Sequence, residues 1–358
     1  MASDKQAWKD KIGHHSQLGG IETSVLDNGL GKGTRIAWFN TGSGFRFKVV
    51  IDRGMDIADA FHGAHSLAWI SHSGVVAPQP FSNQGIDWLR TFSGGLLTTC
   101  GLSHMGPPEA DQYGSRGLHG NFSNTAAEII SILQPDPFSG NMEMSITGLI
   151  NETTVFGPSL QLKRTISAKL GEPTLWVRDE LVNRGNSPAP HMLLYHINCG
   201  YPLIDEGTEI IWNGSWEEMG NKPDGIFKKG KPFKKCPAPM DEHAGFGEDV
   251  AFIKPDTNNR TEVACGFINP KLRMGLQVDF DAKQLPWLIN WQHWGRGEYV
   301  TALEPATNPP IGQAKARAEG TLIQLAPGEI RKYDLCIKVL TQEQEIEQLK
   351  NSNGPDGH

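Results

Sequence analysis

The chain has 358 residues, a net charge of −7 and a pI near 6.0. This balance argues against a general nucleic-acid binder, whose binding face needs clustered Lys and Arg. The N-terminal stretch is polar, and no run approaches the ~18 apolar residues of a membrane span, so we expect neither a secretory signal nor a membrane segment. The five cysteines are far apart and form no C-x-x-C pair. Free thiols in a reducing cytoplasm are therefore expected.

Recurrent turn signals predict an all-β protein, because the 41 glycines and 23 prolines fall between short alternating segments. A short helix is expected at about 4–12, followed by strands at 21–26, 34–39 and 45–51. Longer strands follow from 128 to 198 and again from 261 to 339, and a terminal helix is expected at about 341–350. No linker composition and no repeat interrupts this series. We therefore predict one large antiparallel β-sandwich domain over residues 1–358, with few short helices.

Two long loops stand out between the predicted strands. Residues 71–117 are rich in Gly, Pro and aromatics, and a structureless stretch of that length inside a compact domain is usually functional. Residues 212–249 contain six lysines between Lys222 and Lys235. Those lysines could attract an anionic or phosphorylated sugar. A solvated surface loop is the plainer interpretation.

One carboxylate is placed as a catalytic group would be. Tyr299–Leu303 reads as a strand that delivers Glu304 directly before Pro305. A carboxylate at the end of a rigid strand is easily held in one orientation. Burying it is costly unless something uses its charge. We interpret Glu304 as the base of a sugar-binding site.

Further polar groups could complete such a site. His196 ends an apolar run, and Asn198 shares its strand parity, so both side chains could face one side. His119 lies between two glycines, and its imidazole could both donate to and accept from a sugar hydroxyl. Each histidine has a structural alternative, as a satisfied core or loop residue.

An early patch and a later polar wall add candidates for substrate binding. Arg53 could donate a fork of hydrogen bonds to hydroxyls, with Asp56 three residues on. A salt-bridged turn is the alternative for this pair. Asn124 belongs to a polar stretch after His119 that could line the pocket.

Three tryptophans occur within Trp287–Trp294. Aromatic faces stack on the apolar C–H faces of sugars, so we expect at least one of them to line the site. Trp291 and the nearby His293 are the candidates, with core packing as the alternative. The other histidines show no ligand spacing, so we predict no metal and no cofactor.

Taken in order, these patches resemble the galactose mutarotase-like (aldose 1-epimerase) superfamily, most closely its bacterial DUF4432-type branch. The resemblance covers about residues 20–340 and is carried by Asp52-Arg53-Gly54-Met55-Asp56, Gly117-Leu118-His119-Gly120, Tyr195-His196-Ile197-Asn198, and Leu303-Glu304-Pro305 with Asn308-Pro309. It implies a β-supersandwich with a concave cleft. Where the mutarotase proper carries a second His beside the catalytic one, this chain has Tyr195.

The resemblance also implies roles. Glu304 would take the proton of the anomeric hydroxyl and His196 would protonate the ring oxygen, while His119 and Arg53 would hold the sugar. The chain would then be a mutarotase of a free or anionic sugar. Two alternatives remain open: an aldose–ketose isomerase or other-carbon epimerase using the same pocket, and a non-catalytic carbohydrate-binding protein. The partner expected is a small-molecule sugar, without nucleic acid or membrane, and a homo-oligomer is left open.

Overall fold

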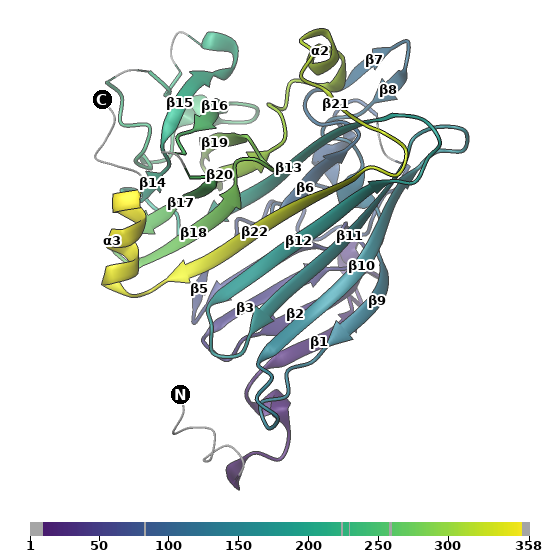
Figure 1. The fold of residues 1–358 in the computed structure, drawn as a ribbon. Coiled ribbons are helices and arrows are strands. Elements are labelled where there is room, and N and C mark those ends of the chain that lie inside the picture. The colour runs from purple at the N-terminus through teal and green to yellow at the C-terminus, as the bar shows by residue number, and fades with distance from the viewer. Residues whose placement is uncertain (1–9, 82–83, 223–224, 229, 258–259, 353–358) are drawn as a thin grey trace.

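The computed structural model describes residues 10–352, except 82–83, 223–224, 229 and 258–259, and the helix predicted at about 4–12 falls mostly outside these ranges. The eight-stranded antiparallel sheet packs against the seven-stranded sheet along one half and against the five-stranded sheet along the other, and all three contribute to the main core (Figure 1). The predicted all-β antiparallel sandwich is confirmed. Within the described ranges, no helix is long and apolar enough to cross a membrane.

The eight-stranded sheet has the order β14-β17-β18-β22-β12-β11-β10-β9. Its strands are β9 (Glu128–Leu133), β10 (Glu143–Thr153), β11 (Ser159–Lys169), β12 (Thr174–Asn183), β14 (Glu209–Ile211), β17 (Glu262–Asn269), β18 (Met274–Asp281) and β22 (Ile330–Leu340). Buried residues alternate with more accessible ones along β11 and through the middle of β12, which gives this sheet one face toward the core and one toward solvent.

The seven-stranded sheet has the order β15-β16-β19-β20-β13-β21, with β6 also paired to β13. Its strands are β6 (Thr98–Leu102), β13 (Ala189–Gly200), β15 (Gly214–Glu218), β16 (Asp249–Pro255), β19 (Trp287–Gly295), β20 (Glu298–Ala306) and β21 (Ile323–Leu325). Unlike β11 and β12, all but one residue of β13 is buried, so both faces of this sheet are covered.

The remaining elements surround these sheets. The five-stranded sheet runs β1 (Gly20–Val25), β2 (Arg35–Asn40), β3 (Phe45–Val50), β4 (Asp56–His62) and β5 (His65–Ser66), and a hairpin joins β7 (Glu109–Asp111) to β8 (Gly114–Arg116). The α-helices are α2 (Gln313–Ala318) and α3 (Glu343–Ser352), the second being the predicted terminal helix. Single 3-10 turns are η1 (His15–Gln17), η2 (Gly29–Gly31), η3 (Asp87–Arg90), η4 (Phe122–Asn124), η5 (Met219–Asn221) and η6 (Asp241–His243).

The two faces of the seven-stranded sheet carry different clusters. Leu193, Tyr195 and Ile197 of β13 belong to the main core between the sheets. Met192 and Leu194 alternate with them and belong to a second cluster on the opposite face. We call that opposite face, with the side chains of Leu194, His196, Ile289, Trp291 and Glu304, the site face.

A buried ion network ties the sheets together behind the site face. The Arg164 guanidinium of β11 is fully buried and donates to both carboxylate oxygens of Asp179 on β12, at 2.7–3.3 Å. Its Nη1 also donates to Asp56 Oδ1 and Thr99 Oγ1 at 3.2 and 2.9 Å. The hydroxyl of Tyr195 donates to Asp179 at 2.7 Å. The network therefore anchors β13 one residue before His196.

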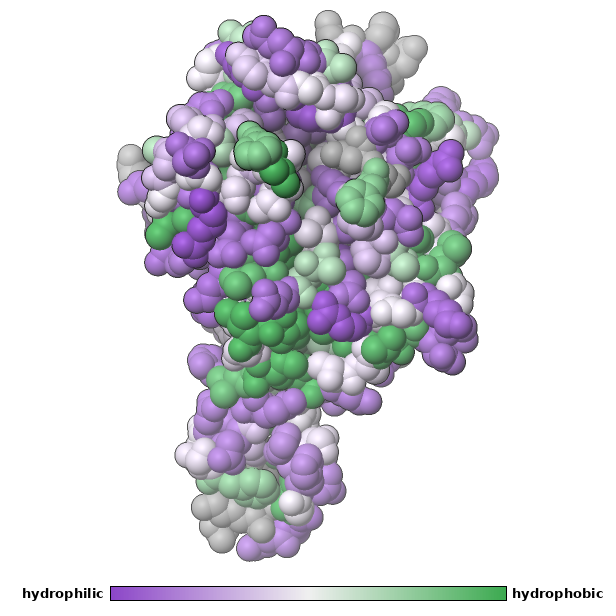
Figure 2. Space-filling view, turned by 90° about the vertical axis from the view of Figure 1, so that its right-hand side faces the viewer, coloured by the Kyte–Doolittle hydropathy of each residue, from purple (hydrophilic) through white to green (hydrophobic). Residues whose placement is uncertain are grey.

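Strand β9 is an edge of the eight-stranded sheet and leaves apolar side chains in solvent. Ile130, Ile132 and Leu133 are 42–49 % exposed. Figure 2 views the side of the molecule on which β9 lies, and apolar surface gathers there. This edge belongs to the other large sheet, so the site face lies elsewhere.

Candidate functional site

His196 and Glu304 meet on the site face. The imidazole Nε2 of His196 lies 3.2 Å from Glu304 Oε1. Both side chains are buried, with 6 % and 3 % of their surface exposed. Residues 108 apart in the sequence thus form one pair. They stand side by side on neighbouring strands of one sheet.

The register of the sheet explains this contact. Leu194 pairs with Ala306 and Ile197 pairs with Leu303, so His196 of β13 falls opposite Glu304 of β20. The ladder of strand pairs is interrupted between these two pairs, where Pro305 has no N–H to donate. Cross-strand neighbours project to the same face, so the two side chains point the same way.

The surroundings of the pair favour its uncharged form. Burial and the neighbouring His119 ring lower the pKa of His196 from its usual 6.5 to about 3. Burial also raises the pKa of Glu304 well above its usual 4.5, and the Glu248 carboxylate adds to the rise. Adding a second proton or removing the last one is therefore unfavourable. The pair behaves as a single unit that holds one proton.

Three buried polar atoms at the pair make no hydrogen bond to the described residues. Two are His196 Nδ1 and the Asn198 side-chain oxygen. The third is Glu304 Oε1, whose 3.2 Å contact with His196 Nε2 does not have hydrogen-bond geometry. The Asn198 amide donates to the carbonyls of Gly95 and His196, both at 3.0 Å. Buried polar atoms without partners are rare in native proteins and call for an explanation. A bound polar ligand would supply it.

His119 is the second histidine of the site. Its φ of 58° is uncommon for a residue with a side chain. Backbone bonds hold it there, with its N–H donating to Gly106 and its carbonyl accepting from Gly101. Gly120 follows with φ 73°, where a Cβ would lie 2.6 Å from the Gly101 carbonyl oxygen. The chain thus turns tightly and directs the ring toward His196, with the two ring centroids 6.5 Å apart.

Hydrogen bonding fixes which nitrogen of His119 carries the proton. The Gly106 N–H donates to His119 Nδ1 at 3.3 Å, so that nitrogen is an acceptor. Burial and the neighbouring His104 lower the pKa of His119 to about 3, which keeps the ring neutral. Its proton then lies on Nε2, which makes this atom a hydrogen-bond donor.

Aromatic rings surround the histidines. Phe92 and Trp291 lie 5.4 and 5.3 Å from the His196 ring, centroid to centroid. Trp88 stacks on Phe92 at 4.3 Å and lies 4.8 Å from His119. Trp88 and Phe92 come from the long loop predicted to be functional. Such a lining suits the C–H faces of a sugar ring.

Trp291 is held by its own partners. Its Nε1 donates to Glu248 Oε2 at 2.7 Å, and the His293 ring stacks against it with centroids 6.0 Å apart. His293 bonds to the Gly247 carbonyl and to Glu298 at 2.5 and 3.3 Å. His293 therefore supports Trp291 instead of reaching the pair.

Arg53 lies behind the loop that carries Trp88. Its Nη1 donates to the Val76 carbonyl at 3.1 Å and to the Asn124 side-chain oxygen at 3.0 Å. The Asn124 amide in turn donates to Thr91 at 3.0 Å. Burial lowers the pKa of Arg53 to about 10, with Asp56 opposing that change. These contacts support a role for Arg53 and Asn124 in holding the loop, and the substrate contact expected from the sequence stays a prediction.

Asp56 is likewise engaged within the protein. It accepts from the backbone N–H and hydroxyl of Thr99, which points to the core side of β6, and from Arg164. The site-face residue beside it on β6 is Cys100. The bonds to Asp56 engage Oδ1 alone, and Asp56 Oδ2 is buried without a hydrogen-bond partner among the described residues, so the predicted contact with substrate stays a prediction.

The structure adds residues that the sequence reasoning did not single out, namely Trp88, Phe92 and Glu248. The spacing of two aromatics four apart, within a loop already considered functional, was the available signal for the first two. Glu248 carried no signal, because only the pairing of β16 with β19 brings it to Trp291. Within the described part of the chain, no group of three or more His, Cys, Asp or Glu side chains is arranged to hold a metal ion.

Comparisons with solved structures agree with this fold. A provisionally assigned aldose 1-epimerase from Klebsiella pneumoniae superposes with a TM-score of 0.82 at 25% identity, covering 93% of this chain and 88% of that one. A galactose mutarotase-like protein from Clostridium acetobutylicum superposes with a TM-score of 0.58 at 12% identity, covering 91% of this chain and 100% of that one. Galactose 1-epimerase from Lactobacillus acidophilus superposes with a TM-score of 0.58 at 12% identity, covering 89% of this chain and 98% of that one.

No curated protein sequence matches the chain. The model of one family, described as a domain of unknown function (DUF4432), matches residues 31–339. That match spans most of the chain, and the superpositions give the fold its galactose mutarotase-like character. The chain therefore belongs to the DUF4432 family and has the galactose mutarotase-like fold.

Proposed function

We propose that this protein is a mutarotase that interconverts the anomers of an uncharged aldose, with Glu304 and His196 as its catalytic residues. The observation that carries the proposal is the buried pair on the site face, 3.2 Å apart, with polar atoms left without partners. The likeness of this chain to a provisionally assigned aldose 1-epimerase also supports an epimerase.

The pair can move protons in both directions needed for ring opening. The reaction starts once the one proton of the pair has passed from Glu304 to His196, so that Glu304 is a carboxylate and His196 an imidazolium. Glu304 takes the proton of the anomeric hydroxyl while His196 gives its proton to the ring oxygen, so the bond from C1 to the ring oxygen breaks and a carbonyl forms. Rotation about the bond beside C1 and the reverse steps close the ring with the other configuration. The pair ends with the one proton it began with.

Access to the pair requires a movement of its cover. His196 and Glu304 are nearly sealed, and the rings of Trp88 and Phe92 lie over the two histidines. Those rings belong to the segment around η3, which packs on the site face through side chains. Displacing that segment admits the sugar, and its return excludes water from the reaction.

The charges near the pair favour a neutral substrate over an anionic one. Among the described residues, the charged side chain that adds to the pKa shift of Glu304 is a second carboxylate, Glu248. In the Lys-rich loop, Lys228 pairs with Glu218 and Lys222 with Asp249. Like charges held a few ångströms apart repel by a few kcal/mol in a partly buried setting.

The test of the proposed function is a screen of free aldoses by exchange NMR. Cross-peaks between α and β anomers should appear at enzyme concentrations where spontaneous exchange is too slow to give them. At least one neutral aldose of a broad panel should respond. A panel in which every sugar exchanges at its spontaneous rate would reject mutarotation.

Substrate charge gives a second expected result. The 6-phosphate of the responding aldose should be turned over about tenfold more slowly or worse, because its dianion would be repelled by the Glu248 carboxylate near the pair. The comparison is made at equal concentrations and in high and low salt. Faster exchange of the phosphate than of the free sugar would contradict the neutral assignment.

The pH profile of kcat/KM reports the proton count of the free enzyme. If Glu304 and His196 titrated independently with ordinary pKa values, the profile would fall off below about pH 4.5 and above about pH 6.5. Here the acid limb moves down toward about 3, where the pair takes a second proton, and the basic limb moves up, because Glu304 holds its proton more tightly. We therefore expect a broad plateau through pH 6.5. A narrow bell centred between 4.5 and 6.5 would show that the groups titrate separately.

A further inference from the structure

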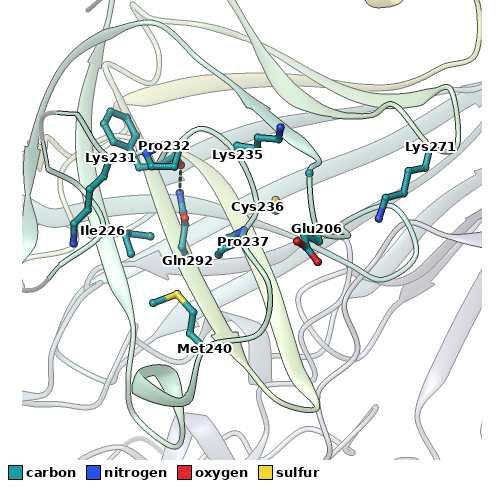
Figure 3. Close-up of a pocket in the computed structure, with 12 residues that line it drawn as sticks. Glu206, Ile226, Lys231, Pro232, Lys235, Cys236, Pro237, Met240, Lys271 and Gln292 are labelled. Carbon is teal, nitrogen blue, oxygen red and sulfur yellow. Dashed lines mark hydrogen bonds between the residues drawn. The ribbon is translucent and has the colours of Figure 1, made fainter.

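A sizeable cavity lies on the other face of the seven-stranded sheet from the catalytic pair. It has a volume of about 730 Å³ and is shown in Figure 3. Gln292 of β19 lines it, and alternation along β19 directs Gln292 away from the face that carries Trp291 and His293. This cavity is therefore separate from the site of the proposed mutarotase.

The walls of the cavity are apolar. Its apolar lining is made by Ile226, Pro232, Phe233, Pro237 and Met240. Phe233 is backed by Trp212, with stacked rings 5.9 Å apart. The polar group at the floor is already satisfied, since the Gln292 amide donates to the Phe233 carbonyl at 2.9 Å and its oxygen accepts from Trp294. Apolar walls with few polar groups are typical of small-molecule sites, and the volume lies in their usual range.

The rim is cationic although the chain as a whole is acidic. Lys231, Lys235 and Lys271 line the cavity against a single carboxylate, Glu206. Lys271 pairs with Asp205 at 2.7 Å, and Lys231 donates to the Gly225 carbonyl at 3.0 Å. Among the described residues, the ammonium of Lys235 has no ion-pair or hydrogen-bond partner. In Figure 3, Lys235 and Lys271 lie on the side of the cavity where Cys236 and Glu206 lie.

We propose that this cavity is a second binding site, which takes an organic anion with an apolar body. The anionic head would be held at the rim by Lys235 and Lys271, and the body would pack against Phe233, Met240 and Ile226. A short charge-assisted contact at Lys235 gives the site its preference for an anion over a neutral molecule of the same shape. The Lys-rich loop then serves this cavity, in place of the substrate role that its sequence suggested.

Naphthalene-1-sulfonate and its uncharged match, naphthalene-1-sulfonamide, test the proposal in titrations followed by calorimetry and saturation-transfer NMR. The wild-type chain should bind the sulfonate about tenfold more tightly or better than the sulfonamide, a gap that corresponds to one strong charged contact. Lys235→Glu should weaken binding of the sulfonate by a similar factor and leave binding of the sulfonamide unchanged. Met240→Trp fills the apolar part of the cavity and should weaken binding of both probes.

The matched control is Lys332→Glu, on the outward face of β22 in the other sheet. It should leave both probes unaffected, and melting curves should show that each variant is folded. The proposal is overturned if neither probe binds at millimolar concentration, if the sulfonate has no advantage, or if Lys235→Glu affects it no more than Lys332→Glu does. Binding is read without any sugar, so the outcome is independent of the proposed mutarotase activity.

Discussion

Replacing Glu304 by glutamine is expected to slow catalysed anomer exchange by about 10²–10⁴-fold, the usual contribution of one acid–base group. The glutamine keeps the shape of the side chain but can take no proton from the anomeric hydroxyl. Burial already favours the uncharged form of Glu304, so the uncharged amide should be tolerated by the fold. The measurement is exchange NMR on the best aldose of the panel.

Glu180→Gln is the matched control, because Glu180 is half-exposed on β12 and, in the described part of the chain, its ion-pair partner is the exposed Lys332, 3.6 Å away. It should leave exchange unchanged. If Glu304→Gln still binds the sugar but no longer catalyses anomer exchange, the variant has lost catalysis and not binding. Full activity in this variant would favour the non-catalytic or other-enzyme alternatives over the proposed function.

Replacing Asp179 by asparagine is expected to lower the free energy of unfolding by about 3–5 kcal/mol. The Arg164 guanidinium and the Asp179 carboxylate that it binds are both fully buried, so water screens neither charge. Removing the carboxylate charge leaves that cation insufficiently compensated and weakens the bond from Tyr195. Urea unfolding followed by circular dichroism measures the change.

Glu180→Gln again gives the comparison, since it is the next residue on β12 but faces solvent. Exposed ion pairs contribute little, so its expected change is about 0.5 kcal/mol or less. If Asp179→Asn proved as mild as this control, the buried network would not be what couples the two sheets. Because Tyr195 adjoins His196, a destabilised variant is also expected to lose exchange activity.

The fold could be predicted from the sequence where apolar and polar residues alternate regularly. Alternation along Ser159–Lys169 predicted a half-buried strand, and the alternating burial of β11 follows from it. It failed at Thr98–Leu102, which is strand β6 inside a stretch expected to be mostly loop. All five of its residues are buried, so no alternation marks them, and the strand exists because β13 pairs with it.

The site was predictable to the extent that single residues show their chemistry. Glu304 and His196 could be named because a strand delivers each to a rim, but their direct contact depends on a cross-strand register that no local pattern records. Arg53 and Asp56 could be named as candidates, but an isolated Arg–Asp patch does not show which partners it will meet, and their contact with substrate stays a prediction. Their partners, Asn124 and Arg164, lie 71 and 108 residues away.

The most direct test of the account is a double-mutant cycle on the catalytic pair, with exchange NMR on Glu304→Gln, His196→Gln and the combined variant. If the two side chains hold one proton and act together, the combined variant should be no slower than the slower single variant, because residues acting as a unit are strongly non-additive. Losses that multiply would show two groups acting separately. Such a result would contradict the shared-proton pair on which the mechanism is built.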